Sequence, residues 1–146
     1  MAITKVTRHN TPAFQATLAS TQNITTATLT KVLFATEGYD TDGKFASNKF
    51  TPTVAGTYNF HIVLTLDDLE DAKSLSAYLY KNGSAISGAI SRVTSSVTDK
   101  VSVTLNWTDI SDADDYYEVY VYHNIGSTEE LRTDYATVFF AYRVIT

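Results

Sequence analysis

The sequence predicts an all-β domain: a jelly-roll sandwich of two antiparallel sheets with about ten strands. Residues that favour strands are abundant, with 10 Tyr and 7 Phe among the 146 residues and many Thr and Val. Apolar and polar residues alternate over short segments, and turn residues separate those segments. No segment has the apolar spacing of a helix, and the length suits one domain with its own core.

The first half contains four predicted strands, chosen from their apolar spacing. They cover residues 13–20, 26–35, 44–50 and 57–66. The last is the clearest, because alternate residues from Tyr58 to Leu66 are all apolar. Gly56 precedes it, and a glycine here predicts a turn that needs a positive φ or a close approach.

The second half contains five predicted strands, which cover residues 75–81, 85–93, 100–107, 116–123 and 135–145. The first two are separated by Asn82-Gly83, which predicts a type I′ hairpin because that turn needs positive φ at both central residues. In the third, apolar residues alternate with polar ones from Val101 to Trp107.

Several of these strands carry aromatic side chains on both faces. Tyr116 and Tyr117 point in opposite directions in a strand, and so do Phe139 and Phe140. Because a two-layer sandwich buries one face of each sheet, the excess aromatic surface predicts a self-interface. The alternative is aromatic side chains that lie on the surface with their hydroxyls in water. The candidates for a trimer interface are Tyr78, Tyr80, Tyr117, Phe139 and Tyr142.

Two motifs resemble the signature of the C1q/tumour-necrosis-factor-like domain. The first motif is Tyr39-Asp-Thr-Asp-Gly43-Lys-Phe45. The second is Phe50-Thr-Pro52-Thr-Val-Ala-Gly56-Thr-Tyr58-Asn-Phe60. Further along, Leu79-Tyr-Lys81-Asn-Gly83 resembles the hairpin of that family. The segment 137–142 resembles its closing strand, with Ala141 where the family usually has glycine.

The resemblance covers nearly the whole chain from Pro12 onward and implies a ten-stranded jelly roll. It also implies a tight homotrimer with aromatic side chains on the threefold axis. The family includes secreted cytokines, complement heads, phage fibre tips and phage capsid decoration proteins. The acidic segment 111–115 stands where the family usually has Gly-Asp, so calcium or ligand sites of the family are not carried over.

Composition and charge exclude several classes of function. The formal net charge of -5 disfavours nucleic-acid binding, and no apolar run is long enough to cross a bilayer. Cysteine is absent, which excludes disulfides and thiolate metal sites. The first residues lack the apolar core of a signal peptide, so we expect a protein made in a host cytoplasm rather than a secreted one.

No catalytic, metal or cofactor site is expected. His9, His61 and His123 lack metal-ligand spacing, and no serine lies in a Gly-x-Ser-x-Gly motif. Acidic clusters occur at residues 67–71 and 109–115, but neither has the EF-hand pattern, so solvated loops are the preferred interpretation.

Residues 1–12 are interpreted as an N-terminal arm before the jelly-roll domain of residues 13–146. The arm contains Lys5 and Arg8 and no acidic residue, whereas the rest of the chain is acidic. Its charge predicts binding to an acidic or mixed protein surface. The residues expected to anchor it to a capsid are Ile3, Lys5, Val6, Arg8 and His9.

The function predicted from these features is that of a non-enzymatic, homotrimeric virion protein on the capsid surface. A phage capsid decoration (cement) protein is preferred, with the major capsid protein or another virion protein as its partner. The alternative is the receptor-binding tip of a phage tail fibre or spike. An extracellular ligand of the complement-head or cytokine kind is the third hypothesis, which the absence of cysteine disfavours.

Overall fold

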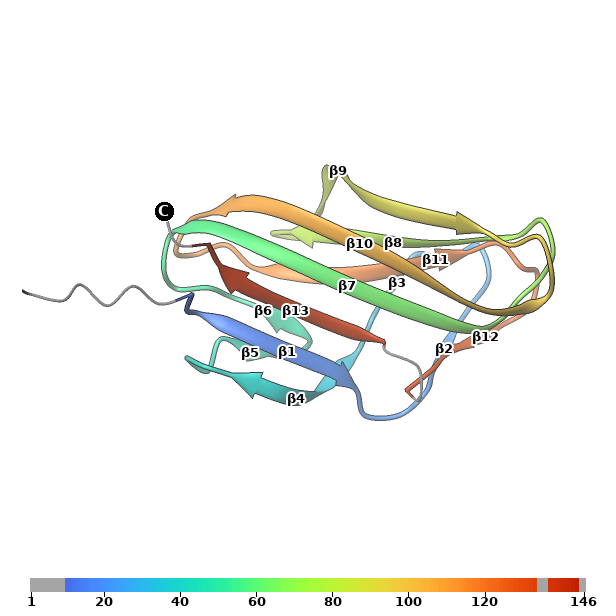
Figure 1. Ribbon diagram of the computed structural model, residues 1–146, viewed down its shortest axis with the longest axis horizontal. Coiled ribbons are helices and arrows are strands. Elements are labelled where there is room, and N and C mark those ends of the chain that lie inside the picture. Colours follow the sequence, from blue (N-terminus) through green and yellow to red (C-terminus); the bar gives the residue numbers. More distant parts are fainter. Residues whose placement is uncertain (1–9, 134–136, 145–146) are drawn as a thin grey trace, which may run out of the picture.

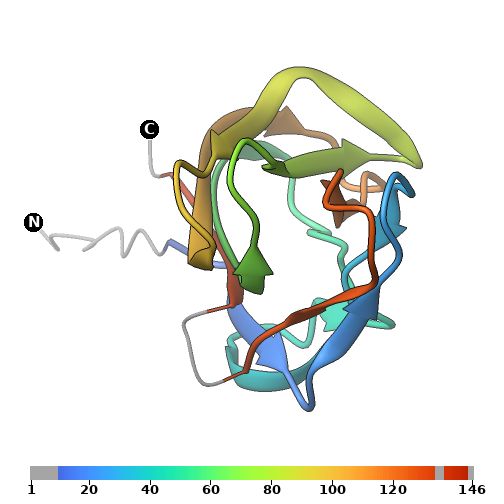
Figure 2. The same cartoon turned by 90° about the vertical axis from the view of Figure 1, so that its right-hand side faces the viewer.

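The computed structural model describes residues 10–133 and 137–144, and within these ranges it contains thirteen β-strands and no helix. The strands form two antiparallel sheets that face each other as a sandwich (Figure 1). The end-on view in Figure 2 shows the strands arranged around a common interior. The all-β, two-sheet prediction is therefore confirmed, with more strands than the sequence predicts.

The larger sheet, which we call sheet 1, has seven strands. The central strand is β7 (Gly56–Leu69), which pairs with β10 (Asp99–Ser111) on one side and β13 (Val138–Arg143) on the other. The other strands are β1 (Ala13–Leu18) and β4 (Phe34–Asp40) next to β13, and β12 (Glu129–Leu131) and β2 (Gln22–Ile24) near the end of β7.

The smaller sheet, which we call sheet 2, has six strands. Its centre is formed by β11 (Tyr117–His123) and β8 (Ser74–Lys81), and β9 (Ser84–Thr94) is its edge beside β8. The remaining strands are β3 (Thr30–Lys31), β5 (Phe45–Ala46) and β6 (Lys49–Phe50).

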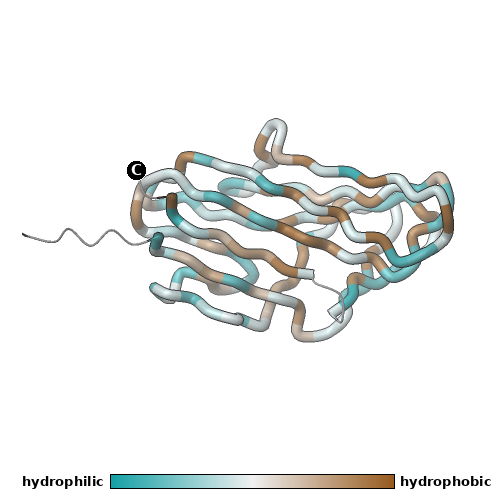
Figure 3. The backbone as a smooth tube through the Cα atoms, viewed as in Figure 1, coloured by the Kyte–Doolittle hydropathy of each residue, from teal (hydrophilic) through white to brown (hydrophobic). Residues whose placement is uncertain are grey.

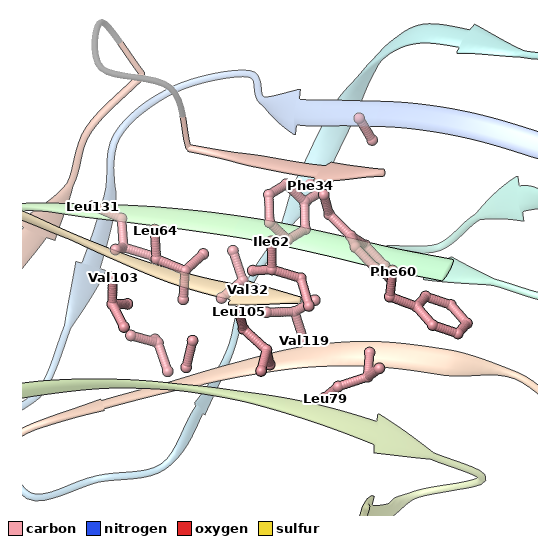
Figure 4. Close-up of a cluster of buried hydrophobic side chains, with 14 of the residues drawn as sticks. Val32, Phe34, Phe60, Ile62, Leu64, Leu79, Val103, Leu105, Val119 and Leu131 are labelled. Atoms are coloured by element: carbon pink, nitrogen blue, oxygen red, sulfur yellow. The ribbon is translucent and has the colours of Figure 1, made fainter. Parts of the chain in front are cut away.

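The core lies between the two sheets and is rich in aromatic rings. Phe14 on β1 stacks on Phe45 and Phe50 of sheet 2, with ring centroids 4.7 and 4.4 Å apart. The edge of Phe139 meets the same Phe14 ring at 4.8 Å. Figure 4 shows aliphatic and aromatic side chains from both sheets meeting in this space, and Figure 3 shows hydrophobic residues alternating with hydrophilic ones along the strands. This alternation is the one that predicts the sandwich.

The predicted strand at residues 26–35 is wrong, because the chain changes sheets there. Ala27 has a positive φ of 54° and follows the end of β2 in sheet 1. The chain then makes the two-residue strand β3 in sheet 2 and returns to sheet 1 with β4, which begins at Phe34. Each crossing between layers ends one set of ladder hydrogen bonds, so no continuous strand can form.

Other predicted elements are close to the observed ones. Residues 44–50 form a small hairpin rather than one strand, since Ser47 and Asn48 have positive φ values of 53° and 59° between β5 and β6. The hairpin at Asn82-Gly83 is confirmed, with φ values of 52° and 78° and with Lys81 paired to Ser84. For the closing strand, the observed bounds are those of β13, and residues 135, 136 and 145 lie outside the described ranges.

Candidate functional site

The middle of the outward side of sheet 1 is an uncharged surface. Phe60, Ile62 and Leu64 of β7 are buried, so the residues between them face outward. Strand pairing aligns outward residues of β10, β7, β13 and β1 in three rows. We call this surface the sheet-1 face; its rows are Thr104, Val63, Val138 and Thr17; Asn106, His61, Phe140 and Gln15; Thr108, Asn59, Tyr142 and Ala13. None of these residues is charged, although 18% of the chain is.

Polar side chains of the sheet-1 face bond to one another across β7 and β10. His61 Nδ1 contacts Asn106 Oδ1, and Asn59 Nδ2 donates to the Thr108 hydroxyl over 3.0 Å. The Phe140 ring lies beside the His61 ring, with centroids 4.7 Å apart. Because these polar groups are already paired, a second surface can cover them without leaving them unsatisfied.

The outward side of sheet 2 differs, because tyrosines dominate it. Tyr78 of β8 lies opposite Tyr120 of β11, and the rings of Tyr80 and Tyr120 have centroids 4.2 Å apart. These three tyrosines are partly buried rather than fully exposed to solvent. Burial, then the neighbouring Tyr120 and Tyr78, raise the pKa of Tyr80, so its hydroxyl stays protonated at neutral pH. We call the following set the tyrosine face: Tyr78, Tyr80, Tyr116, Tyr120 and Tyr122.

Charged side chains flank the tyrosine face. Lys31 Nζ pairs with Glu118 over 2.6 Å, which neutralises both groups beside Tyr120. Lys49 Nζ lies 4.7 Å from the centre of the Tyr116 ring, a cation–π arrangement. Arg92 on β9 donates from Nε to the Ser76 hydroxyl over 3.0 Å. The salt bridges among the described residues include neither Lys49 nor Arg92.

A lysine at the end of β8 joins two acidic side chains. Lys81 Nζ lies 3.2 Å from Asp109 and 2.9 Å from Asp115, and it also donates to the Ile110 carbonyl over 2.7 Å. Burial alone lowers the pKa of Lys81, but its hydrogen bonds to Asp115 and Asp109 outweigh this and raise it. The Tyr117 hydroxyl donates to Asp109 over 2.8 Å. We call Lys81, Asp109 and Asp115 the Lys81 cluster, which ties the β10–β11 turn to β8.

The interpretation of residues 109–115 as a solvated loop is therefore wrong in part. Asp115 is only 6% exposed, and its carboxylate accepts bonds from the Asp112 amide and from Asn82 Nδ2, both over 2.7 Å. Burial raises the pKa of Asp115, but Lys81 and these donors outweigh it and hold the pKa below its usual value. In the other acidic cluster, Asp67 pairs with Arg132 at 3.2 Å.

Four further features of the described structure concern metal binding, a buried histidine, a cavity and membrane crossing. Within residues 10–133 and 137–144, no three His, Cys, Asp or Glu side chains come together as a metal site. His123 is buried, with Nε2 2.9 Å from the Ile24 carbonyl, and so serves the fold. One open cavity of about 400 Å³ is lined by residues without ionisable side chains, namely Ala19, Ser20, Thr21, Gln22, Asn23, Leu33 and Ala35. No helix of the described chain is long and apolar enough to cross a membrane.

The five predicted interface residues do not form one surface. Tyr78 and Tyr80 belong to the tyrosine face, and Tyr142 belongs to the sheet-1 face. Tyr117 and Phe139 are 0% exposed in the core, so both were assigned to the wrong side of their strands. The anchoring residues predicted in the N-terminal arm, Ile3, Lys5, Val6, Arg8 and His9, lie outside the described residues.

The interface candidates chosen from the sequence do not include Tyr116 and Phe140, which are partly buried. Tyr116 and Phe140 face outward next to the two buried residues. The Lys81 cluster was also missed, although a lysine directly before Asn82-Gly83 and the acidic run 109–115 were both visible in the sequence. Nothing in the sequence alone shows that the two segments meet.

Comparisons with known proteins identify the fold. No family model matches the chain, and no curated protein sequence matches it. Among solved structures, the globular domain of zebrafish complement 1qA is 16% identical, with a TM-score of 0.64 over 92% of this chain and 98% of that one. Eiger TNF from S. frugiperda is 10% identical, with a TM-score of 0.64 over 91% and 90%. Murine APRIL at pH 5.0 is 8% identical, with a TM-score of 0.67 over 90% and 98%. The predicted C1q/TNF-like jelly roll is thereby confirmed.

Proposed function

We propose that this protein is a non-enzymatic homotrimeric module that associates through the sheet-1 face and serves as a structural protein of a virus particle. The observation that carries the self-association is the uncharged sheet-1 face. Interface centres are depleted in charged residues and enriched in aromatic ones, and this face has His61, Phe140 and Tyr142 at its centre. The bond between Asn59 and Thr108 and the contact between His61 and Asn106 lower the cost of removing water from this face.

The geometry favours a ring over a face-to-face dimer. Strands about 4.8 Å apart and alternate residues about 6.7 Å apart make the three rows a patch of a few hundred Å². A stable interface buries roughly 800 Å² on each partner, so a second patch is needed. Ile110 of β10 enlarges the patch, because it lies two residues beyond Thr108 on the same side of the strand and is 73% exposed. In a trimer this patch packs against a different part of the next protomer, and such a heterologous contact closes into a ring.

Two features of the described residues, the cavity and the Lys81 cluster, support a role without catalysis. The cavity contains no ionisable side chain, and the Lys81 cluster is already internally paired. The setting we propose is a phage capsid, where the protein acts as a decoration protein; the tip of a tail fibre is the alternative. The absence of cysteine and the basic residues Lys5 and Arg8 in an otherwise acidic chain support a particle assembled in a cytoplasm.

An extracellular ligand is the second candidate, and a specific observation favours it. Two of the similar structures are a TNF protein and a complement 1qA domain. At 16% identity or less the likeness carries the fold alone, so this candidate stands on analogy. Gold-labelled antibodies against the protein on purified virus particles separate the settings. Label on heads supports decoration, label on tail tips supports the fibre tip, and unlabelled particles support the ligand.

Light scattering tests the assembly. The expected mass is three times the chain mass of 16.1 kDa. Phe140→Lys places a charge in the centre of the sheet-1 face and should yield monomers, whereas the control Tyr122→Lys on the tyrosine face should leave the mass unchanged. A monomeric wild-type protein, or a Phe140→Lys variant that keeps the trimer mass, contradicts the proposal.

A further inference from the structure

The tyrosine face has an unusual apolar composition. On β8 and β11 the outward side chains are tyrosines, serines and one glutamate, so every large apolar surface there is a phenol ring. On β9, Ala85 lies opposite Tyr80, and Ile90 lies opposite Tyr78 and is 47% exposed. Protein interfaces are enriched in methionine as well as in aromatic residues, and β8, β9 and β11 contain no methionine. The composition therefore suits a partner that presents C–H surface together with many hydroxyl groups.

The hydroxyl groups of this face are available for binding. Among the described residues none of these five hydroxyls has a hydrogen-bond partner, whereas the hydroxyls of the buried Tyr58 and Tyr117 do. Tyr58 donates to the Val54 carbonyl over 2.7 Å, and Tyr117 donates to Asp109 over 2.8 Å. Rigid phenol rings with free hydroxyls give contact area and hydrogen bonds at a low cost in conformational entropy.

Two cations lie at opposite ends of the tyrosine face. Lys49 lies over Tyr116 at one end, and Arg92 is opposite Ser76, which pairs with Tyr122 at the other. From Tyr116 to Tyr122 the strand extends about 20 Å. Positive groups at this spacing on a chain of net charge -5 favour an extended anionic partner.

We propose that the tyrosine face binds an acidic polysaccharide. Sugar rings lie on the phenol rings of Tyr78 and Tyr120, sugar hydroxyls bond to the tyrosine hydroxyls, and carboxylates pair with Lys49 and Arg92. This binding goes beyond the proposed structural role and needs only one protomer. In a trimer built through the sheet-1 face, sheet 2 stays exposed, and three copies would strengthen attachment to one surface.

The test measures binding of the full chain to immobilised polysialic acid, hyaluronan and neutral dextran. We expect binding to at least one acidic polymer, none to dextran, and a decrease with added salt. Tyr120→Ser and Arg92→Gln should each weaken binding by about tenfold. Matched controls are Tyr39→Ser, which removes a tyrosine that is 45% exposed on sheet 1, and Lys73→Gln in the β7–β8 turn; both should bind like wild type.

Three results would overturn the proposal. The first is a folded wild-type protein that binds neither acidic polymer. The second is equal binding by Tyr120→Ser and Tyr39→Ser, which would mean that the attraction is nonspecific. The third is a lower mass of Tyr120→Ser in light scattering, which would make this face a contact between copies. Because Phe140→Lys tests the trimer separately, failure here leaves the proposed function standing.

Discussion

Gly56 opens the central strand of sheet 1, and its replacement by valine tests how the strand begins. The residue has φ +152°, a conformation that L side chains rarely adopt. A Cβ atom built there would lie 2.8 Å from Nε of Arg143 on β13, closer than real Cβ contacts. Arg143 in turn donates from Nη2 to the Ala55 carbonyl over 3.1 Å. Gly56→Val therefore strains the backbone and displaces the arginine.

The loss in free energy of unfolding that we expect for Gly56→Val follows from these two effects. Backbone strain in a sparsely populated region costs about 1–3 kcal/mol for a non-glycine residue. Displacing Arg143 removes one hydrogen bond, worth about 1 kcal/mol net. We expect a loss of about 2–4 kcal/mol in the free energy of unfolding. Gly43→Val is the matched control, because Gly43 also has a positive φ, of 60°, but a Cβ atom there meets nothing within 4 Å.

The assay is urea unfolding at one fixed protein concentration, because an oligomer's stability depends on concentration. Gly56→Val should lower the transition midpoint more than Gly43→Val does. When Arg143 is already replaced by alanine, Gly56→Val should lower the free energy of unfolding by about 1 kcal/mol less, because no arginine side chain has to be displaced. Equal costs in both backgrounds, or no shift for Gly56→Val, would refute the reasoning.

Three further predictions concern the Lys81 cluster, catalysis and the arm. Lys81→Met should destabilise by about 1–3 kcal/mol in thermal unfolding, because it leaves the carboxylate of Asp115 buried without its cation; a neutral result would refute the cluster. Since the pKa of Asp115 lies below 3.8, its stabilisation is present above pH 3.8 and lost as pH falls further, and wild type should lose more stability in acid than Lys81→Met. No hydrolysis of polysaccharides, esters or phosphates is expected; turnover lost on replacing Asp67, Glu70, Asp112 or Asp115 would contradict this. Deleting residues 2–11 should leave the trimer mass unchanged and abolish binding to decoration-free capsids, and equal binding would mean that the arm is not the anchor.

The sequence predicts the long strands well, for a local reason. Alternation from Tyr58 to Leu66 and the Asn82-Gly83 turn depend on side chains within a few residues of one another, so β7 and the β8–β9 hairpin could be placed. The shortest strands could not be placed in this way. β12 has three residues and pairs with β2, about a hundred residues earlier, so its existence depends on the tertiary fold.

The candidate interface was only partly predictable, because alternation does not say which side faces the core. Tyr116 and Tyr117 are equally aromatic, as are Phe139 and Phe140, so the sequence leaves two choices of register. The core settles them through shape. The ring centroids of Phe139 and Phe14 are 4.8 Å apart, and those of Tyr117 and Phe60 are 4.4 Å apart. This packing leaves Phe140 and Tyr116 on the outward side.

The central rows of the two outward faces differ in how their polar side chains are satisfied, and this difference supports a separate role for each face. At the centre of the sheet-1 face, His61 contacts Asn106. On the sheet-1 face, Asn59 and Thr108 bond to each other, so a permanent partner can exclude water there at small cost. On the tyrosine face the hydroxyls of Tyr78 and Tyr120 have no partner among the described residues, so exclusion of water would leave them unpaired. A permanent apolar contact is thus unfavourable on sheet 2, whereas a hydroxyl-rich ligand can replace the lost water bonds. Self-association through sheet 1 and ligand binding through sheet 2 are therefore compatible in one trimer.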